Sequence, residues 1–177
     1  YSRNPQKLIY VPETADSLTI LDGTTGIAMC AVESCNQITT YTGIPESVTY
    51  IGERAFYGSG LQNIVLPENI TGIGTYAFAS MPHLESVVLP EGMEVIPNNL
   101  FGGDIALRSV TIPSTVTRIS SEAFWNCRSL CGIVIPASVK EIYNNVFHYT
   151  DPNGEFKDTP MVATINGTWK ASELKER

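Results

Sequence analysis

The residues most able to do chemistry are four cysteines: Cys30, Cys35, Cys127 and Cys131. A thiol can bind zinc, take part in redox exchange or form a disulfide, and each role needs suitably spaced partners. The sequence contains no C-x-x-C pair, and its two histidines, His83 and His148, form no H-x-x-x-H pair. A zinc or redox site is therefore not indicated.

Motifs for catalysis are also missing from the sequence. It has no G-x-S-x-G, no G-x-x-x-x-G-K-[ST] and no G-x-G-x-x-G that opens a helix. Its acidic pairs are scattered, without the enclosed pocket that general acid–base catalysis needs. We expect a protein that is not an enzyme, with no catalytic residues and no cofactor.

Three glutamates, Glu46, Glu68 and Glu91, each follow a proline at a regular spacing. Stacked carboxylates repel one another unless they splay into water or share a cation. A solvated acidic edge is one interpretation, and a weak calcium site or a docking edge for a basic partner is the other. The segment 151–158, DPNGEFKD, is slightly like a calcium loop, but its glycine is the fourth residue instead of the sixth. This mismatch favours an ordinary insertion loop, and we expect no metal site.

These residues belong to a sequence repeat whose period is 23. Segments 61–83, 84–106 and 107–129 align without a gap, and a fourth begins in register at Leu130. The prolines that mark the repeat recur at intervals of 22, 23, 23 and 23: Pro45, Pro67, Pro90, Pro113 and Pro136. The aromatic landmarks keep the same spacing: Phe56, Phe78, Phe101, Phe124 and Phe147. Self-similarity of this length predicts a solenoid, in which each unit buries its apolar face only against its neighbours.

Each unit begins with a short strand. In segment 107–113, LRSVTIP, apolar and polar residues alternate and several are β-branched, which is typical of a strand. Pro113 removes a backbone donor and ends the ladder at the same place in every coil. Val116 and Ile119 then turn back toward the core.

A turn is expected to close each coil. Ala123 and Phe124 lie in this region, which we predict to be one turn of α- or 3-10 helix, with Phe101 and Phe124 stacked in the core. The residue three before each phenylalanine is mostly of a type that caps short helices: Glu53, Thr75, Asn98, Ser121 and Asn144. Gly52 and Gly74 mark a place where the backbone is expected to need an unusual conformation.

The repeat organises the chain as one solenoid domain over residues 1–177. Residues 1–17 are interpreted as a worn N-terminal coil, 18–147 as the repeats, and 148–177 as an insertion loop followed by a C-terminal cap. The chain opens inside a coil, which suggests a piece of a longer protein. A net charge of −7 argues against nucleic acid or an anionic membrane as partner. No apolar stretch approaches the roughly 18 residues of a membrane span, and we expect no membrane insertion and a monomer.

The repeat also limits how the cysteines pair. Cys35 and Cys127 hold equivalent positions four coils apart, so at about 4.8 Å per stacked strand they lie on the order of 19 Å apart. Disulfides need Cα atoms within about 7 Å, so these two cannot pair. Cys30–Cys35 and Cys127–Cys131 pairs remain possible, while buried thiols acting as small hydrophobes are the favoured interpretation.

The outward face of the strands is the candidate binding surface. In each strand the first, fourth and sixth residues face the core, so the third and fifth face the concave surface. The candidate ligand-binding residues are Asn63, Val65, Ser86, Val88, Ser109, Thr111 and Val134. They form a shallow apolar strip beside a polar column, which suits an extended peptide or a glycan. The alternative is that β-branched residues are simply those that strands prefer.

One column of the opposite face is aromatic or imidazole: Tyr57, Trp125 and His148 follow the phenylalanine position. Aromatic side chains are enriched at interfaces, so these residues are candidate anchors for a partner. Packing of each side chain over its own turn is the other interpretation.

The repeat consensus, I-P…I-G…A-F-x-x-C, resembles that of the BspA-like (treponemal-type) leucine-rich repeat proteins. The match runs over residues 18–147, with departures at Leu21, Val32, Pro97 and Leu100. The resemblance implies a leucine-rich-repeat right-handed superhelix of 23-residue coils, with short parallel strands on the concave face and short helical or 3-10 turns on the convex face. It further implies a surface-exposed or secreted protein, chiefly of host-associated bacteria and some protist parasites, with adhesion as the usual role.

Three hypotheses of function follow. The first is an extracellular or cell-surface binding module, an adhesin that recognises a host or microbial protein or glycan through the concave sheet. The second is a structural spacer within a longer surface protein, which would bind nothing itself. The third is an oligomerisation element, in which exposed ends or edges of the solenoid pair.

Overall fold

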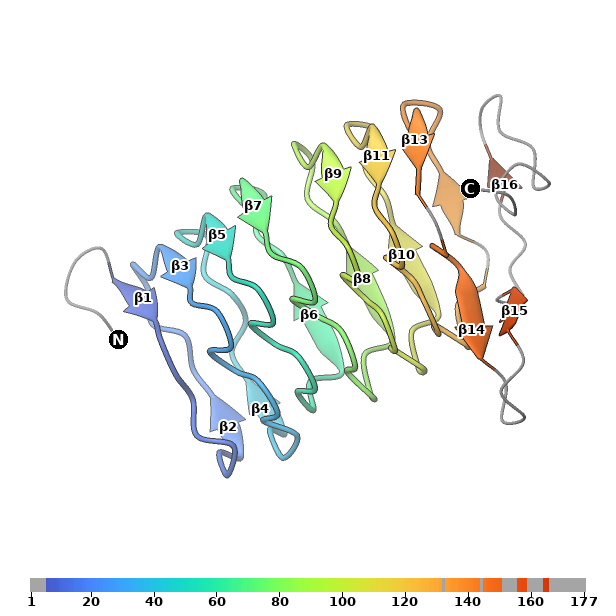
Figure 1. Cartoon of the computed structure of the whole chain (residues 1–177). Coiled ribbons are helices and arrows are strands. Elements are labelled where there is room, and N and C mark those ends of the chain that lie inside the picture. Colours follow the sequence, from blue (N-terminus) through green and yellow to red (C-terminus); the bar gives the residue numbers. More distant parts are fainter. Residues whose placement is uncertain (1–5, 132, 144, 151–155, 159–163, 166–177) are drawn as a thin grey trace.

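Coils stacked side by side form most of the part of the chain that the structure describes, and each of these coils contributes two short strands (Figure 1). The computed structural model describes residues 6–131, 133–143, 145–150, 156–158 and 164–165. One set of strands, the odd row, consists of β1 (Lys7–Leu8), β3 (Gly26–Ile27), β5 (Tyr50–Ile51), β7 (Gly72–Ile73), β9 (Val95–Ile96), β11 (Arg118–Ile119) and β13 (Glu141–Ile142). The other set, the even row, consists of β2 (Ser17–Leu18), β4 (Thr40–Tyr41), β6 (Asn63–Val65), β8 (Ser86–Val88), β10 (Ser109–Thr111) and β12 (Val134–Ile135).

Strands pair in parallel with the register that the repeat predicts. Ser86 of β8 pairs with Asn63 of β6 and with Ser109 of β10, which are the equivalent residues of the two neighbouring coils. Toward the C-terminus, β14 (His148–Thr150) pairs antiparallel with β15 (Phe156–Asp158), and β16 (Thr164–Ile165) pairs parallel with β12. The predicted solenoid, with one sequence repeat in each coil, is therefore confirmed. The cap proposed for the last residues lies outside the described ranges.

A column of phenylalanine rings forms the core. Adjacent rings lie 5.6, 6.0, 5.6 and 5.6 Å apart between centroids, with interplanar angles of at most 24°: Phe56, Phe78, Phe101, Phe124 and Phe147. Phe101 and Phe124 are fully buried, as the sequence predicts. Since one ring comes from each of five successive coils, each of these coils depends on its neighbours for burial.

The turn around each phenylalanine is not helical, so the prediction of a helical or 3-10 turn is wrong. The described residues contain no helix, and therefore none that could cross a membrane. Residues two before the phenylalanine have a left-handed backbone, with φ between +51° and +59°: Arg54, Tyr76, Asn99, Glu122 and Asn145. Backbone N–H groups here point to the next coil; for example, Phe56 donates to the Ala77 carbonyl at 2.8 Å. These bonds to the next coil alternate with bonds within the turn, such as that from the Tyr57 N–H to the Arg54 carbonyl at 3.1 Å, so no continuous helix forms.

The reason for Gly52 and Gly74 also differs from the prediction. Neither glycine has a positive φ. A Cβ atom at Gly52 would lie 2.5 Å from the Met29 nitrogen, and one at Gly74 would lie 2.3 Å from the Glu53 nitrogen. Successive coils of the N-terminal half thus approach so closely that no side chain fits at this position.

Candidate functional site

The outward side of the even row presents the candidate residues. In β6, β8 and β10 the middle residue is buried and the two flanking residues are exposed. The valines are exposed by 76% at Val65, 60% at Val88 and 44% at Val134. Side chains this open do little for the core, so they are free to meet a partner. Their role in binding stays a prediction.

Register places six of the seven candidate residues in two straight columns, while Val134 lies on β12, which pairs with β16 and not with β10. Val65, Val88 and Thr111 pair directly across β6, β8 and β10, and so do Asn63, Ser86 and Ser109. Neighbouring strands lie about 4.8 Å apart, so an apolar column runs beside a column of one amide and two hydroxyls. None of these side chains is charged. The surface can therefore offer apolar contact and neutral hydrogen bonds to one extended ligand.

A hollow of about 450 Å³ adjoins this surface where β4 and β6 are not paired with each other. Its polar lining consists largely of amides, hydroxyls and an imidazole: Asn36, Gln37, Thr39, Tyr41, Gln62, Asn63 and His83. The sequence pattern does not predict this hollow. The signal for it was a missing residue: Asn63 of β6 follows Phe56 by 7 residues, whereas Ser86 of β8 follows Phe78 by 8.

Tyr41 is the most constrained side chain of the hollow. Its hydroxyl is enclosed and has no hydrogen-bond partner. Burial raises the pKa of Tyr41 well above that of a free tyrosine, so the hydroxyl keeps its proton. It is therefore a neutral donor with no acceptor of its own.

Two neighbouring residues of the acidic column are in direct contact. The backbone N–H of Glu91 donates to Oε2 of Glu68 at 3.0 Å, so these two residues are linked through the main chain. Among the described residues, no group of three or more histidines, cysteines and acids could hold a metal ion. The calcium-like segment 151–158 falls mostly outside the residues described.

All four cysteines are free thiols, so neither of the two possible disulfides is formed. The thiols of Cys35 and Cys127 are buried and donate to backbone carbonyls, Cys127 to that of Phe101 at 3.0 Å. Burial raises the pKa of both thiols. A thiol with a raised pKa is a poor nucleophile near neutral pH, and these two act as small core residues.

Tyr57, one of the aromatic residues that follow the phenylalanines, packs over its own turn. Its ring centroid lies 3.9 Å from the guanidinium carbon of Arg54, and the Arg54 Nε donates to Oε1 of Glu33 at 2.9 Å. Hydrogen bonds from the Cys30 thiol and from Arg54 lower the pKa of Glu33. For Tyr57 the packing interpretation therefore accounts for the residue without a partner.

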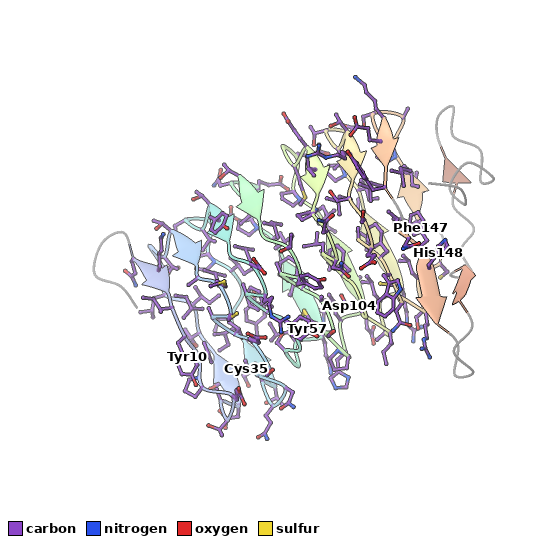
Figure 2. The ribbon with its side chains drawn as sticks, viewed as in Figure 1. Tyr10, Cys35, Tyr57, Asp104, Phe147 and His148 are labelled. Carbon is purple, nitrogen blue, oxygen red and sulfur yellow. The ribbon has the colours of Figure 1, made fainter. Side chains whose placement is uncertain are left out.

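One buried carboxyl group was missed by the sequence analysis. Asp104 occupies the repeat position of Cys127 and is completely buried in the middle of the stack (Figure 2). Its Oδ1 accepts from the Met81 N–H at 2.7 Å, while its Oδ2 has no partner. Burial raises the pKa of Asp104 well above the usual range, although the bond from Met81 acts in the opposite direction. The sequence signal was an acid at a position that holds cysteine in other coils.

Comparison with known families fits this geometry. The family described as the BspA type leucine rich repeat region matches residues 25–153 in six copies. The chain belongs to this family. No curated protein matches it.

Solved structures of bacterial leucine-rich repeat proteins share the fold. A leucine-rich repeat protein from Bacteroides ovatus is 27% identical with a TM-score of 0.71, and the match covers 80% of this chain and 40% of that one. A leucine rich repeat protein from T. pallidum is 29% identical with a TM-score of 0.58, covering 63% of this chain and 52% of that one. A leucine rich cell surface protein from Faecalibacterium prausnitzii, 22% identical with a TM-score of 0.52, covers 90% and 55% and supports the fold alone. This BspA-type chain thus spans about half the length of these relatives or less.

Proposed function

We propose that this BspA-type chain is a binding module of a bacterial surface or secreted protein. In this proposal it recognises an extracellular host or microbial protein, or a glycan, through the outward side of the even row. The observation that carries the proposal is the pair of registered columns, in which Val65 and Val88 are mostly exposed beside Asn63 and Ser86. Valines this exposed bury little apolar surface in the fold, which leaves them available for contact with a ligand.

The chemistry of this surface favours a neutral, extended ligand. Amides and hydroxyls can form hydrogen bonds with a peptide backbone or with sugar hydroxyls, and the valine column offers apolar contact alongside them. The adjoining hollow extends the same chemistry past Asn63 to Gln62 and His83. A cell-surface location is part of the proposal and rests on membership of the BspA-type leucine-rich repeat family.

The test is a binding screen of the purified chain against extracellular-matrix proteins and a glycan array. The variant Val65→Lys/Val88→Lys should lose any saturable hit, because two ammonium groups would disrupt the apolar column. A matched control, Ile105→Lys/Tyr143→Lys, adds the same charge at two exposed positions away from the even-row surface. Binding that survives in the first variant, or that the control also abolishes, would contradict this assignment.

A structural spacer is the second candidate. It is favoured by one observation, namely that the chain spans only 40% of the Bacteroides ovatus protein. Binding could then reside in other parts of a longer protein. Silence across the screen, with a folded monomer in sedimentation at two concentrations, is the outcome that this candidate predicts.

A further inference from the structure

The odd row is interrupted between β7 and β9. Strands β1, β3, β5 and β7 form one sheet, and β9, β11 and β13 form another. The even-row strands of the same two coils, β6 and β8, pair over three residues. These coils therefore stay joined on one side and separate on the other, and Figure 1 shows the wider step in the row of arrows.

Two substitutions in one coil account for the interruption. At the preceding junction, the Thr71 N–H donates to the Thr49 carbonyl and the Gly74 N–H to the Ile51 carbonyl, both at 2.8 Å. At the following junction, the N–H groups of Thr117 and Ser120 make the equivalent bonds at 2.9 Å. The residues that hold these positions at the interrupted junction are Glu94 and Pro97.

Glu94 and Pro97 each lack a hydrogen-bond donor that the equivalent residues of the intact junctions provide. Pro97 has no N–H group, so the carbonyl of Ile73 cannot receive its bond. Glu94 also lacks the hydroxyl with which Thr71 and Thr117 each form a second bond to the preceding coil, at 3.0 and 3.2 Å. No hydrogen bond joins β7 to β9 in the part of the chain that the structure describes. Both strands thus present open edges to each other.

A cleft of about 740 Å³ lies over these open edges. This is within the range of about 300–1,000 Å³ that is usual for ligand sites. Its lining comes from residues 68–73 of one coil and from residues 91–95 and 97 of the next. Ile70 and Met93 are buried beneath it, while Ile73 and Val95 are half-buried. The floor is therefore apolar.

Charge at the cleft has one sign. Glu68, Glu91 and Glu94 line it and are exposed, and no lysine or arginine is among its lining residues. The net charge of −7 disfavours a second copy of this chain as occupant. A cationic ligand is the complement that these carboxylates select.

We propose that this cleft binds one extended, basic peptide segment of a partner protein as an added strand. Open strand edges recruit peptides by backbone hydrogen bonding, and the side chains that alternate along the peptide add specificity. Lysines or arginines on one side of the peptide would reach the three glutamates, and apolar residues on the other would contact Ile73, which lies on the core side of β7 in register with buried Ile51. Strands β7 and β9 each offer an open edge of two residues, and a peptide of six residues at about 3.3 Å each would span these edges and the residues that flank them. This site is separate from the even-row surface of the proposed function.

The test measures fluorescence anisotropy of a labelled hexapeptide, KVKVKV, titrated with the full chain. Saturable binding is expected for KVKVKV, and none for the matched acidic peptide EVEVEV. N-methylation of alternate amides in KVKVKV removes backbone donors and keeps the charges, so it should weaken binding at least tenfold. Equal affinity for the methylated peptide, or for EVEVEV, would show that no strand is added, and absence of binding to KVKVKV would overturn the proposal.

Variants locate the site. Glu94→Thr/Pro97→Ser restores the donors of the intact junctions and should abolish binding by closing the ladder. Glu68→Gln/Glu91→Gln keeps the acceptor for the Glu91 N–H and should weaken binding by about tenfold at low salt. Glu46→Gln, an exposed glutamate of the same column outside the cleft, is the matched control and should change nothing. Binding that persists in the closed variant, or that weakens equally in Glu46→Gln, would contradict the site.

Two further readouts keep the test decisive. If the closed variant does not fold, the comparison of Glu68→Gln/Glu91→Gln with Glu46→Gln decides alone. Hydrogen exchange should show the amides of Glu94 and Val95 gaining protection with KVKVKV, and unchanged exchange there would refute an added strand. Val65→Lys/Val88→Lys should bind KVKVKV as the native chain does, so failure of the even-row proposal would leave this result intact.

Discussion

The even row and the odd row are built from the same coils, yet at one junction they behave differently. Between β6 and β8 the ladder continues, with the Glu85 N–H donating to the Gln62 carbonyl at 3.1 Å. Between β7 and β9 it stops. A proline is present beside both rows: Pro90 follows β8, where no donor is needed, whereas Pro97 occupies a donor position. The effect of a proline on a solenoid therefore depends on which backbone group the neighbouring coil needs.

The two coils stay packed against each other at the interrupted junction because the phenylalanine column and the turn hydrogen bonds continue across it. The rings of Phe78 and Phe101 remain stacked at 6.0 Å, slightly wider than the 5.6 Å of the other pairs. The N–H of Phe78 still donates to the Leu100 carbonyl at 3.2 Å. Each missing hydrogen bond costs about 1 kcal/mol net. This loss is small beside the burial of a phenylalanine on each side.

The largest expected effect comes from removing the ring next to the interrupted junction. Phe101→Ala should cost about 3–5 kcal/mol of unfolding free energy, since it leaves a cavity where the odd row gives no support. Hydrogen exchange should then show loss of protection that begins at residues 84–106 and spares the coils before β7. Phe124→Ala, at a junction where both rows are intact, is the control and should lose the C-terminal coils first. Uniform loss along the chain in both variants would contradict a nearest-neighbour solenoid.

Much of the fold could be predicted from the sequence because the positions that repeat most regularly are those that are buried. The phenylalanine column and the strands of the even row carry a regular spacing and an alternating pattern, and both are confirmed. The turn was predicted wrongly because helix and left-handed turn share the same apolar residues. What separates them is a backbone bond to the next coil, as from Phe101 to Ala123. Propensity cannot reveal such a bond.

The interruption was beyond the sequence for a related reason. Pro97 was recognised as a departure from the consensus, but its row of two-residue strands has too few residues to show an alternating pattern. Because the sequence did not predict the odd row, it gave no reason to expect that residue 97 should donate a hydrogen bond to the preceding coil. The hollow beside Asn63 likewise accompanies a change of one residue in the repeat, and the sequence pattern does not show what such a change does to strand pairing. The exposed columns of the even row, by contrast, followed directly from period two.

The next effect tests the close approach of the N-terminal coils. Gly74→Ala should destabilise the protein by about 1–3 kcal/mol, because the new Cβ would lie 2.3 Å from the Glu53 nitrogen. The odd row should then open between β5 and β7, as it does naturally one coil later. Thermal unfolding gives the stability, and faster exchange of the Gly74 amide would report the opening. Ser120→Gly is the control, since this position already accommodates a side chain, and an equal cost there would reject close approach as the cause.

Asp104 accepts a hydrogen bond from the Met81 N–H and so links the two coils of the interrupted junction inside the core. Because Asp104 can ionise, its contribution to stability depends on pH. The folded protein holds the Asp104 proton to higher pH than the unfolded chain does, because burial raises its pKa. Stability from this group therefore falls as pH rises above the unfolded value of about 3.9. Asp104→Asn keeps an acceptor for the Met81 N–H and removes the ionisation.

The expected result for Asp104→Asn is a gain of about 1–3 kcal/mol at pH 7 that shrinks toward pH 4. Urea unfolding at both pH values measures it. Asp22→Asn is a surface control, because Asp22 is exposed. A gain of the same size at pH 4 and pH 7 would mean that packing, and not the buried charge, is responsible.

The smallest effect distinguishes the two sides of the even row. Val88→Lys should change the unfolding free energy by no more than about 0.5 kcal/mol, because this side chain is 60% exposed and packs little. Val87→Lys, one residue earlier and buried, should unfold or severely destabilise the chain by placing a charge in the core. Chemical denaturation of both variants measures the contrast. A large cost at Val88 would mean that the exposed column supports the fold, and loss of binding in its lysine variants would then say nothing about contact with a ligand. A negligible change in unfolding free energy would mean that Val88 is not needed for the fold. Loss of binding in the lysine variants would then report contact with a ligand.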